Sequence, residues 1–180
     1  ITAHAGVPLV IELFRRLGAG QVVNEQVRIK QRQRGLLPAQ LVETLIALWV
    51  AGGDRCQDLT TLRADVALAT LLGYELPAAT TMRDFLEGFH VKEPPLWRAG
   101  EKATIPEESA PLTGLGAANR HLLTAVQQQA PQTTATLDVD ATILVTHKHT
   151  AAVTYESTRG YQPVVAVWAE QDLMVHDEFR

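Results

Sequence analysis

Two aspartates in the segment Leu137-Asp138-Val139-Asp140-Ala141 have the residue type and spacing that metal-dependent chemistry uses. The neighbouring residues are β-branched or apolar and alternate with polar ones, which predicts a strand. Side chains two positions apart on a strand project from one face, so the two carboxylates would lie side by side. Aspartate is depleted in strands and adjacent negative charges repel each other, so this placement needs compensation. A divalent cation such as Mg²⁺, which prefers carboxylate oxygens, would supply it.

The same two aspartates allow other interpretations. An antiparallel sheet often has one face in water, where Asp138 and Asp140 would be ordinary surface residues. Two neighbouring carboxylates can also share a proton and act as an acid and base pair in a small-molecule hydrolase. The sequence offers no further pocket residue for such an enzyme.

A second candidate site is a basic segment, residues 27–34, in which four cations alternate with other residues and no acid intervenes. These cations are Arg28, Lys30, Arg32 and Arg34. Their alternation would place all four on one side of an extended segment, where the phosphates of a DNA duplex could accept hydrogen bonds from them. A solvated loop or an edge strand protected against aggregation is the alternative interpretation.

Composition limits the classes of protein to consider. The chain has 180 residues, 46% hydrophobic, and a formal net charge of −4, which argues against wholesale disorder and against nonspecific coating of nucleic acid. Its one cysteine, Cys56, excludes a disulfide framework and a cysteine-rich zinc module. No apolar run approaches the roughly 18 residues of a membrane helix, and the N-terminus lacks the pattern of a signal peptide. These features predict a cytoplasmic protein that does not enter a membrane.

Two kinds of periodicity divide the chain. Up to residue 132 apolar residues recur with helical spacing, which suits a compact bundle or a helix-turn-helix-like module. Helices are predicted over residues 8–17, 38–51, 59–64, 65–72, 80–90 and 115–129. A proline-rich and charged connector is predicted at about 91–113.

From residue 133 the period changes to two, which predicts strands. The expected strands span residues 134–143, 161–170 and 173–179, with a turn at Gln171-Asp172. A short turn between the last two strands predicts an antiparallel meander. The expected fold class is therefore α+β, with a helical domain over residues 1–132 and a sheet over 133–180.

Several motifs together resemble bacterial insertion-sequence DDE transposases, whose catalytic core is RNase H-like. In the second half of the chain the matching stretches are residues 137–143, Thr146-His147-Lys148, Gly160-Tyr161-Gln162-Pro163 and residues 168–173. In the helical half they are residues 51–53, 62–65, 72–73 and 81–85, and the connector matches at 105–108. The likeness covers nearly the whole chain.

The resemblance implies that residues 133–180 begin an incomplete RNase H-like catalytic domain and that residues 1–132 form a DNA-binding helical region. The first catalytic aspartate of that family matches Asp140, with Asp138 as the second choice. The family's second aspartate and its glutamate lie farther along its chain, beyond Arg180. The chain on its own is therefore expected to be inactive.

The implied function of the complete protein is DNA transposition. It would cleave and join transposon ends by phosphoryl transfer with two Mg²⁺ ions, for which Mn²⁺ could substitute, about 3.5–4 Å apart. The expected partners are the double-stranded terminal repeats and a second copy of the protein on DNA, at the nucleoid in the cytoplasm. Two alternatives stay open: a noncatalytic DNA-binding or regulatory remnant of a transposase, and a structural helical domain with an incidental sheet.

Overall fold

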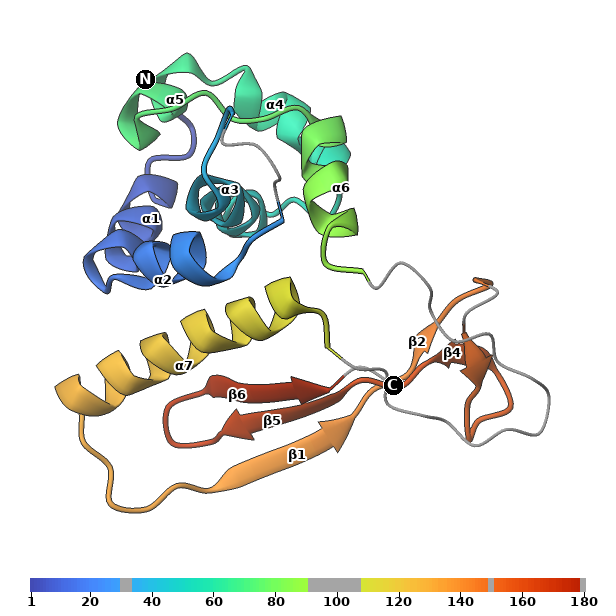
Figure 1. Ribbon diagram of the computed structural model, residues 1–180. Coiled ribbons are helices and arrows are strands. Elements are labelled where there is room, and N and C mark those ends of the chain that lie inside the picture. The colour runs from blue at the N-terminus through green and yellow to red at the C-terminus, as the bar shows by residue number, and fades with distance from the viewer. Residues whose placement is uncertain (30–33, 91–107, 149–150, 179–180) are drawn as a thin grey trace. The chain divides into compact units, whose positions relative to one another are not determined.

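The computed structural model describes residues 1–29, 34–90, 108–148 and 151–178 (Figure 1). The chain divides into two compact units, which are treated separately below. The helical unit contains residues 1–90 and 109–122, and the sheet unit is built on residues 123–178. The predicted class of mixed helix and antiparallel sheet is confirmed.

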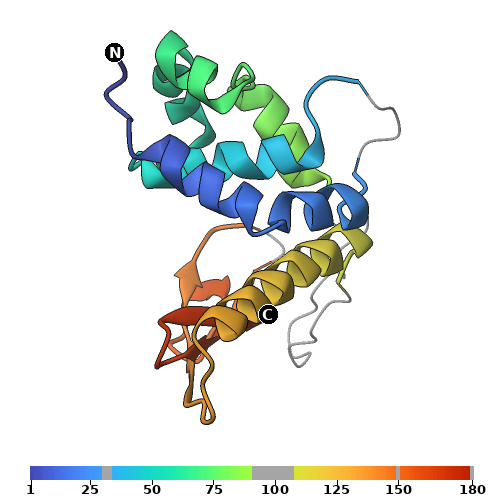
Figure 2. The ribbon, with the colours of Figure 1, turned by 90° about the vertical axis from the view of Figure 1, so that its left-hand side faces the viewer.

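The helical unit surrounds one central helix, α3. Its elements are α1 (Val7–Arg16), α2 (Ala19–Gln26), α3 (Pro38–Val50), the 3₁₀ helix η1 (Cys56–Asp58), α4 (Leu59–Arg63), α5 (Val66–Leu72), α6 (Ala79–Glu87) and the first part of α7 (Ala110–Gln129). Figure 1 views α3 nearly end-on with α1, α2 and α6 around it, and Figure 2 shows it from the side. Leu41, Ala47 and Leu48 of α3 are buried in a core shared with α1, α2 and α4 to α6.

Helix α2 was not predicted, because Gly18 and Gly20 read as the end of α1. Gly18 does end α1 in the left-handed conformation, with φ of 75°, but the chain enters a second helix immediately afterwards. Gly20 lies inside that helix, buried, where an added Cβ would come 3.4 Å from the ring of Phe14. Here the glycine permits close packing of two helices instead of breaking one.

Two predicted helix boundaries were also wrong. α7 begins at Ala110, five residues before the predicted start, because Pro111 occupies its first turn, where the missing N–H costs nothing. α6 begins at Ala79, one residue before the predicted start. Asp65, predicted as the first residue of its helix, is the N-cap of α5, since its Oδ1 accepts a hydrogen bond from the backbone N–H of Leu68 at 2.9 Å.

The main sheet of the sheet unit is the predicted antiparallel meander. Its strands are β1 (Leu137–Ala141), β5 (Val164–Trp168) and β6 (Leu173–Glu178), in the order β1-β5-β6. Leu137 pairs with Trp168 and Ala141 with Val164. A bulge opposite Ala166 and Val167 interrupts the pairing of β5 with β6.

A second small sheet lies between β1 and β5 in the sequence. It contains β2 (Leu144–Val145), β3 (Ala152–Val153) and β4 (Arg159–Tyr161), antiparallel in the order β2-β4-β3. Gly160 in its central strand is buried, and an added Cβ would lie 2.7 Å from the carbonyl oxygen of Leu144. These strands were not predicted, because two or three residues are too few to show a period.

Candidate functional site

Asp138 and Asp140 lie on β1, as predicted, and both are exposed. Asp138 pairs with Val167 and Asp140 with Val165 on β5. Since paired and alternate residues share a face, the two aspartates project from the same face of the sheet. Neither carboxylate has a hydrogen-bond or ion-pair partner among the described residues, so both are available to a ligand from solution.

The sheet adds a third acid to this face. Val165 pairs on its other side with Asp177 of β6, so Asp140, Val165 and Asp177 form one row across three strands. Two strand spacings, about 10 Å, separate Asp140 from Asp177 at the backbone. The described part of the chain contains no group of three His, Cys, Asp or Glu residues that could hold a metal ion.

Asp138 and Asp140 therefore provide two carboxylate ligands. Mg²⁺ is commonly held by one or two carboxylates together with substrate phosphates and water. An exposed pair on an accessible strand fits that arrangement when a nucleic acid supplies the other oxygens. The opposite face of β1 is apolar, and its Leu137 and Val139 are 58% and 59% exposed.

Glu170, which belongs to a transposase-like stretch without an assigned role, fixes the start of β1. Its carboxylate accepts hydrogen bonds from the backbone N–H of Thr136 at 2.9 Å and from the Thr136 hydroxyl at 2.6 Å. The backbone N–H of Ala169 donates to the Thr136 carbonyl at 3.0 Å. The Thr136 hydroxyl and N–H stabilise the ionised form and lower the pKa of Glu170. This contact positions the residue two places before Asp138.

The basic segment belongs to the helical unit, and the structure describes two of its four predicted cations. Arg28 is exposed, with its Nε donating to the carbonyl of Glu25 at 3.2 Å, and Arg34 is exposed as well. Lys30 and Arg32 lie outside the described residues. The apolar residues on either side of Arg28 point inward. Val27 is fully buried. Ile29 packs closely against Gly88, since a Cβ added to that glycine would lie 2.2 Å from Ile29 Cγ2. Residues 27–29 thus alternate inward and outward, and residues 30–33 of the predicted alternation fall outside the described ranges.

The burial of α3 excludes one docking geometry. Among the residues of α3 only Trp49 and Val50, at its C-terminal end, are exposed. Since a recognition helix must present a face to the major groove, α3 cannot serve as one. α2 does present polar exposed residues, namely Gln21, Asn24, Glu25 and Gln26.

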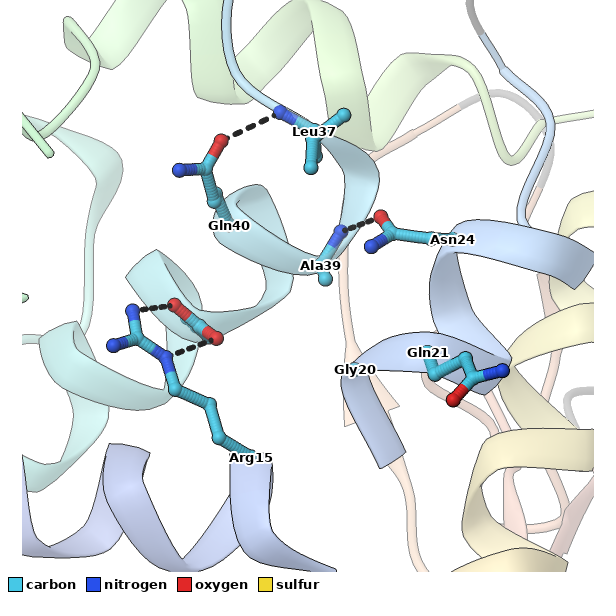
Figure 3. Close-up of a pocket in the computed structure, with 8 residues that line it drawn as sticks. Arg15, Gly20, Gln21, Asn24, Leu37, Ala39 and Gln40 are labelled. Atoms are coloured by element: carbon cyan, nitrogen blue, oxygen red, sulfur yellow. Dashed lines mark hydrogen bonds and ion pairs between the residues drawn. The ribbon is translucent and has the colours of Figure 1, made fainter. Parts of the chain in front are cut away.

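A cavity of about 300 Å³ in the helical unit was not predicted. It lies between α1, α2 and the start of α3, and Figure 3 shows eight of its lining residues. At its side, Arg15 donates from Nε to Glu43 Oε1 at 2.8 Å and from Nη2 to Oε2 at 2.6 Å. Nη2 also donates to the carbonyl of Leu72 at 2.9 Å. The hydrogen bonds from Arg15 to Glu43 raise the pKa of the guanidinium above its ordinary value.

This ion pair was not predicted, although the sequence carried a signal for it. Glu43 interrupts the apolar stripe of α3 and is buried, and a buried carboxylate requires a partner. Its partner, Arg15, lies 28 residues away, beyond the reach of local patterns. Tyr74 completes the surroundings, with its ring centroid 6.0 Å from the guanidinium carbon and its hydroxyl donating to the Gln40 carbonyl at 3.2 Å. Burial raises the pKa of Tyr74.

No helix in the described ranges combines the length and apolar character needed to cross a membrane. His147 and Lys148 are exposed. Comparisons with protein families, with curated proteins and with solved structures found no match to this chain.

Proposed function

We propose that this chain is part of a DNA transposase with an RNase H-like catalytic core, in which Asp140 ligates Mg²⁺ at the scissile phosphate. The observation that carries the proposal is an exposed pair of aspartates on β1, with carboxylates free to bind a cation. The motif resemblance supports it, because the first catalytic aspartate of that family matches Asp140. Asp138, two residues away on the same face, is the second candidate for this role.

In this mechanism the Asp140 carboxylate would hold a divalent ion, and that ion would supply Lewis-acid stabilisation of charge at the scissile phosphate. Asp140 would contribute one oxygen ligand and Asp138 another, while DNA phosphates occupy other positions on the ion. Further carboxylates would come from outside the described residues, because no group of three His, Cys, Asp or Glu residues within them could hold a metal ion. The described chain alone is therefore expected to bind a divalent ion weakly and not to cleave DNA.

Metal binding can be tested on this chain directly. Titrated Mn²⁺ should broaden the NMR signals of residues 138–141 and of their neighbours on β5 before those of the rest of the sheet. Asp140→Asn should abolish the broadening, whereas Asp172→Asn, at the exposed turn before β6, should leave it unchanged. Equal broadening in wild type and Asp140→Asn would exclude Asp140 as a metal ligand.

Strand cleavage tests the catalytic step in the complete protein that carries this sequence. With Mg²⁺ or Mn²⁺ it should nick a duplex that contains the terminal repeat of the element, and Asp140→Asn should remove that activity. Cleavage that survives Asp140→Asn would refute the assignment.

A second candidate function, DNA binding without catalysis, is favoured by the basic segment. Buried Val27 and half-buried Ile29 anchor this segment to the helical unit and leave Arg28 exposed for phosphate contact. Removing one phosphate contact should flatten the dependence of log K on log salt by roughly 0.9. Arg28→Gln and Arg34→Gln should each reduce the slope in this way, and Arg55→Gln, on the exposed loop after α3, is the control. An unchanged slope in both variants would remove the segment from the interface.

A further inference from the structure

Strand β1 carries the two candidate metal ligands and has little packing to hold it in place. All five of its residues are exposed, and β5 is its only neighbour among the strands that the structure describes (Figure 1). Neither Asp138 nor Asp140 has a side-chain partner among the described residues. The position of both carboxylates therefore depends on the hydrogen bonds between β1 and β5 and on how these bonds end.

The hydrogen bonds between the two strands end in an incomplete pair on both sides. In an antiparallel ladder, alternate residues exchange two N–H···O bonds with the residue opposite. After β1, the N–H of Thr142 donates to the Pro163 carbonyl at 3.0 Å, and proline has no N–H to return the bond. Before β1, the N–H of Ala169 donates to the Thr136 carbonyl at 3.0 Å, but the Thr136 N–H turns to a side chain instead of returning the bond.

The Glu170 carboxylate replaces the missing bond at the start of β1. Its Oε2 accepts the Thr136 N–H at 2.9 Å, and its Oε1 accepts the Thr136 hydroxyl at 2.6 Å. Hydrogen bonds to an ionised carboxylate are roughly twice as strong as bonds between neutral groups. Because Glu170 lies in the turn between β5 and β6, it ties the start of β1 to the turn that joins the other two strands.

Thr136 shares a face of the sheet with both aspartates. Residues two positions apart on a strand project to the same side, so Thr136 precedes Asp138 by about 7 Å along the strand. Both oxygens of Glu170 accept hydrogen bonds from Thr136, so this carboxylate is engaged beside the candidate metal ligands. Partners that orient metal ligands from outside the coordination shell are arranged in this way.

Resting on the proposed metal binding by Asp140, we propose that Glu170 is a positioning residue for the metal site and acts through Thr136. By completing the hydrogen bonds at the start of β1, Glu170 holds the backbone of Asp138 and Asp140 in the geometry in which both carboxylates reach one ion. Without this contact the start of the exposed strand frays, and the ion is held by fewer oxygens at once.

The strand offers variants with matched controls. Thr136→Val removes the hydroxyl without changing the charge, and Thr136→Ser keeps it. Thr142→Val is the control, because Thr142 lies on the same face two residues after Asp140 and its hydroxyl has no partner among the described residues. Glu170→Gln removes the carboxylate, and Glu156→Gln, in the exposed turn before β4, removes the same charge elsewhere. Unchanged NMR chemical shifts in β5 and β6 verify that each variant stays folded.

The experiment titrates Mn²⁺ into the full chain, and the broadening of the Asp140 amide signal gives the dissociation constant. Thr136→Val and Glu170→Gln should weaken binding roughly 10-fold, the lower end of the range for partners outside the coordination shell. Thr136→Ser and the two controls, Thr142→Val and Glu156→Gln, should bind as wild type does. The double variant Thr136→Val with Glu170→Gln should bind no more weakly than Glu170→Gln alone, since the hydroxyl acts only through that carboxylate.

Equal Mn²⁺ affinity in wild type, Thr136→Val and Glu170→Gln would overturn the positioning role while leaving the proposed metal binding by Asp140 in place. Tighter binding by Thr136→Val would also overturn it, because Glu170 released from the hydroxyl would then be a ligand of the ion itself. If Asp140→Asn bound Mn²⁺ as tightly as wild type, the proposed function would itself fail, and the positioning role would fail with it.

Discussion

Replacing Gly114 by alanine tests how α7 packs within the helical unit. Gly114 is buried, and an added Cβ would lie 2.6 Å from the carbonyl oxygen of Gln26 and 2.8 Å from its carbonyl carbon. Both are backbone atoms, which cannot rotate out of the way, so either α7 or the end of α2 must shift. Overpacking of this kind costs about 1–3 kcal/mol.

The matched control is Gly116→Ala, two residues farther along α7. Its added Cβ would meet a single neighbour, the flexible Nη1 of Arg120, at 3.4 Å. Both substitutions gain about 1 kcal/mol of helix propensity, which cancels when the two variants are compared. Gly114→Ala should therefore be less stable than Gly116→Ala by about 1–3 kcal/mol, and Gly116→Ala should be at least as stable as wild type.

Urea unfolding followed by far-UV circular dichroism measures this difference. Gln26 immediately precedes Val27 and Arg28, so Gly114→Ala should also weaken DNA binding if the basic segment contacts phosphates. Equal unfolding midpoints for the two alanine variants would refute the packing of α7 against the end of α2.

Two further predictions concern carboxylates. Glu43→Ala leaves the Arg15 guanidinium without its carboxylate and should lower the free energy of unfolding of the helical unit by about 2–4 kcal/mol. This is less than the largest cost of breaking a fully buried ion pair, because the Arg15 side chain is 34% exposed. Urea unfolding measures the change, and a decrease under about 0.5 kcal/mol would contradict the prediction. The pKa of Glu170 lies below its ordinary value of 4.5, so its contribution to stability is present above that value and disappears as the pH falls through the lower folded-state pKa. The Thr136 amide signal in NMR should follow this titration, and Glu170→Gln should remove it; a signal that moves identically in the variant would assign the titration to another group.

Long periodic segments were predictable from the sequence. The helices α1, α3 and α5 follow apolar stripes, and Pro8, Pro38 and Asp65 mark where they begin. The strands β1, β5 and β6 follow the alternation of apolar and polar residues. α2 was not predictable in this way, because two glycines within three residues, Gly18 and Gly20, indicate the end of a helix when only the neighbouring sequence is considered. Its helical conformation depends on the packing of Gly20 against Phe14, which is a tertiary contact.

The features of the candidate sites also divide into those that follow from local sequence and those that depend on tertiary contacts. The shared face of Asp138 and Asp140 follows from strand geometry, and the outward position of Arg28 follows from its alternation with Val27 and Ile29. The pair of Arg15 with Glu43 could not be predicted, because the partner of a buried acid is set by how helices pack. Similarly, no local pattern brings the Glu170 carboxylate to Thr136, 34 residues earlier in the chain.

The bulge in β6 changes which side chains of that strand lie on which face of the sheet. In an uninterrupted ladder, residues 173 and 177 are an even number of positions apart and would share a face. With Val175 as the extra residue, Leu173 pairs with Trp168 on the apolar side, while Asp177 pairs with Val165 on the side that carries Asp140. A one-residue irregularity thus brings Asp177 to the face that carries Asp138 and Asp140, while Leu173 stays on the face of Leu137 and Trp168.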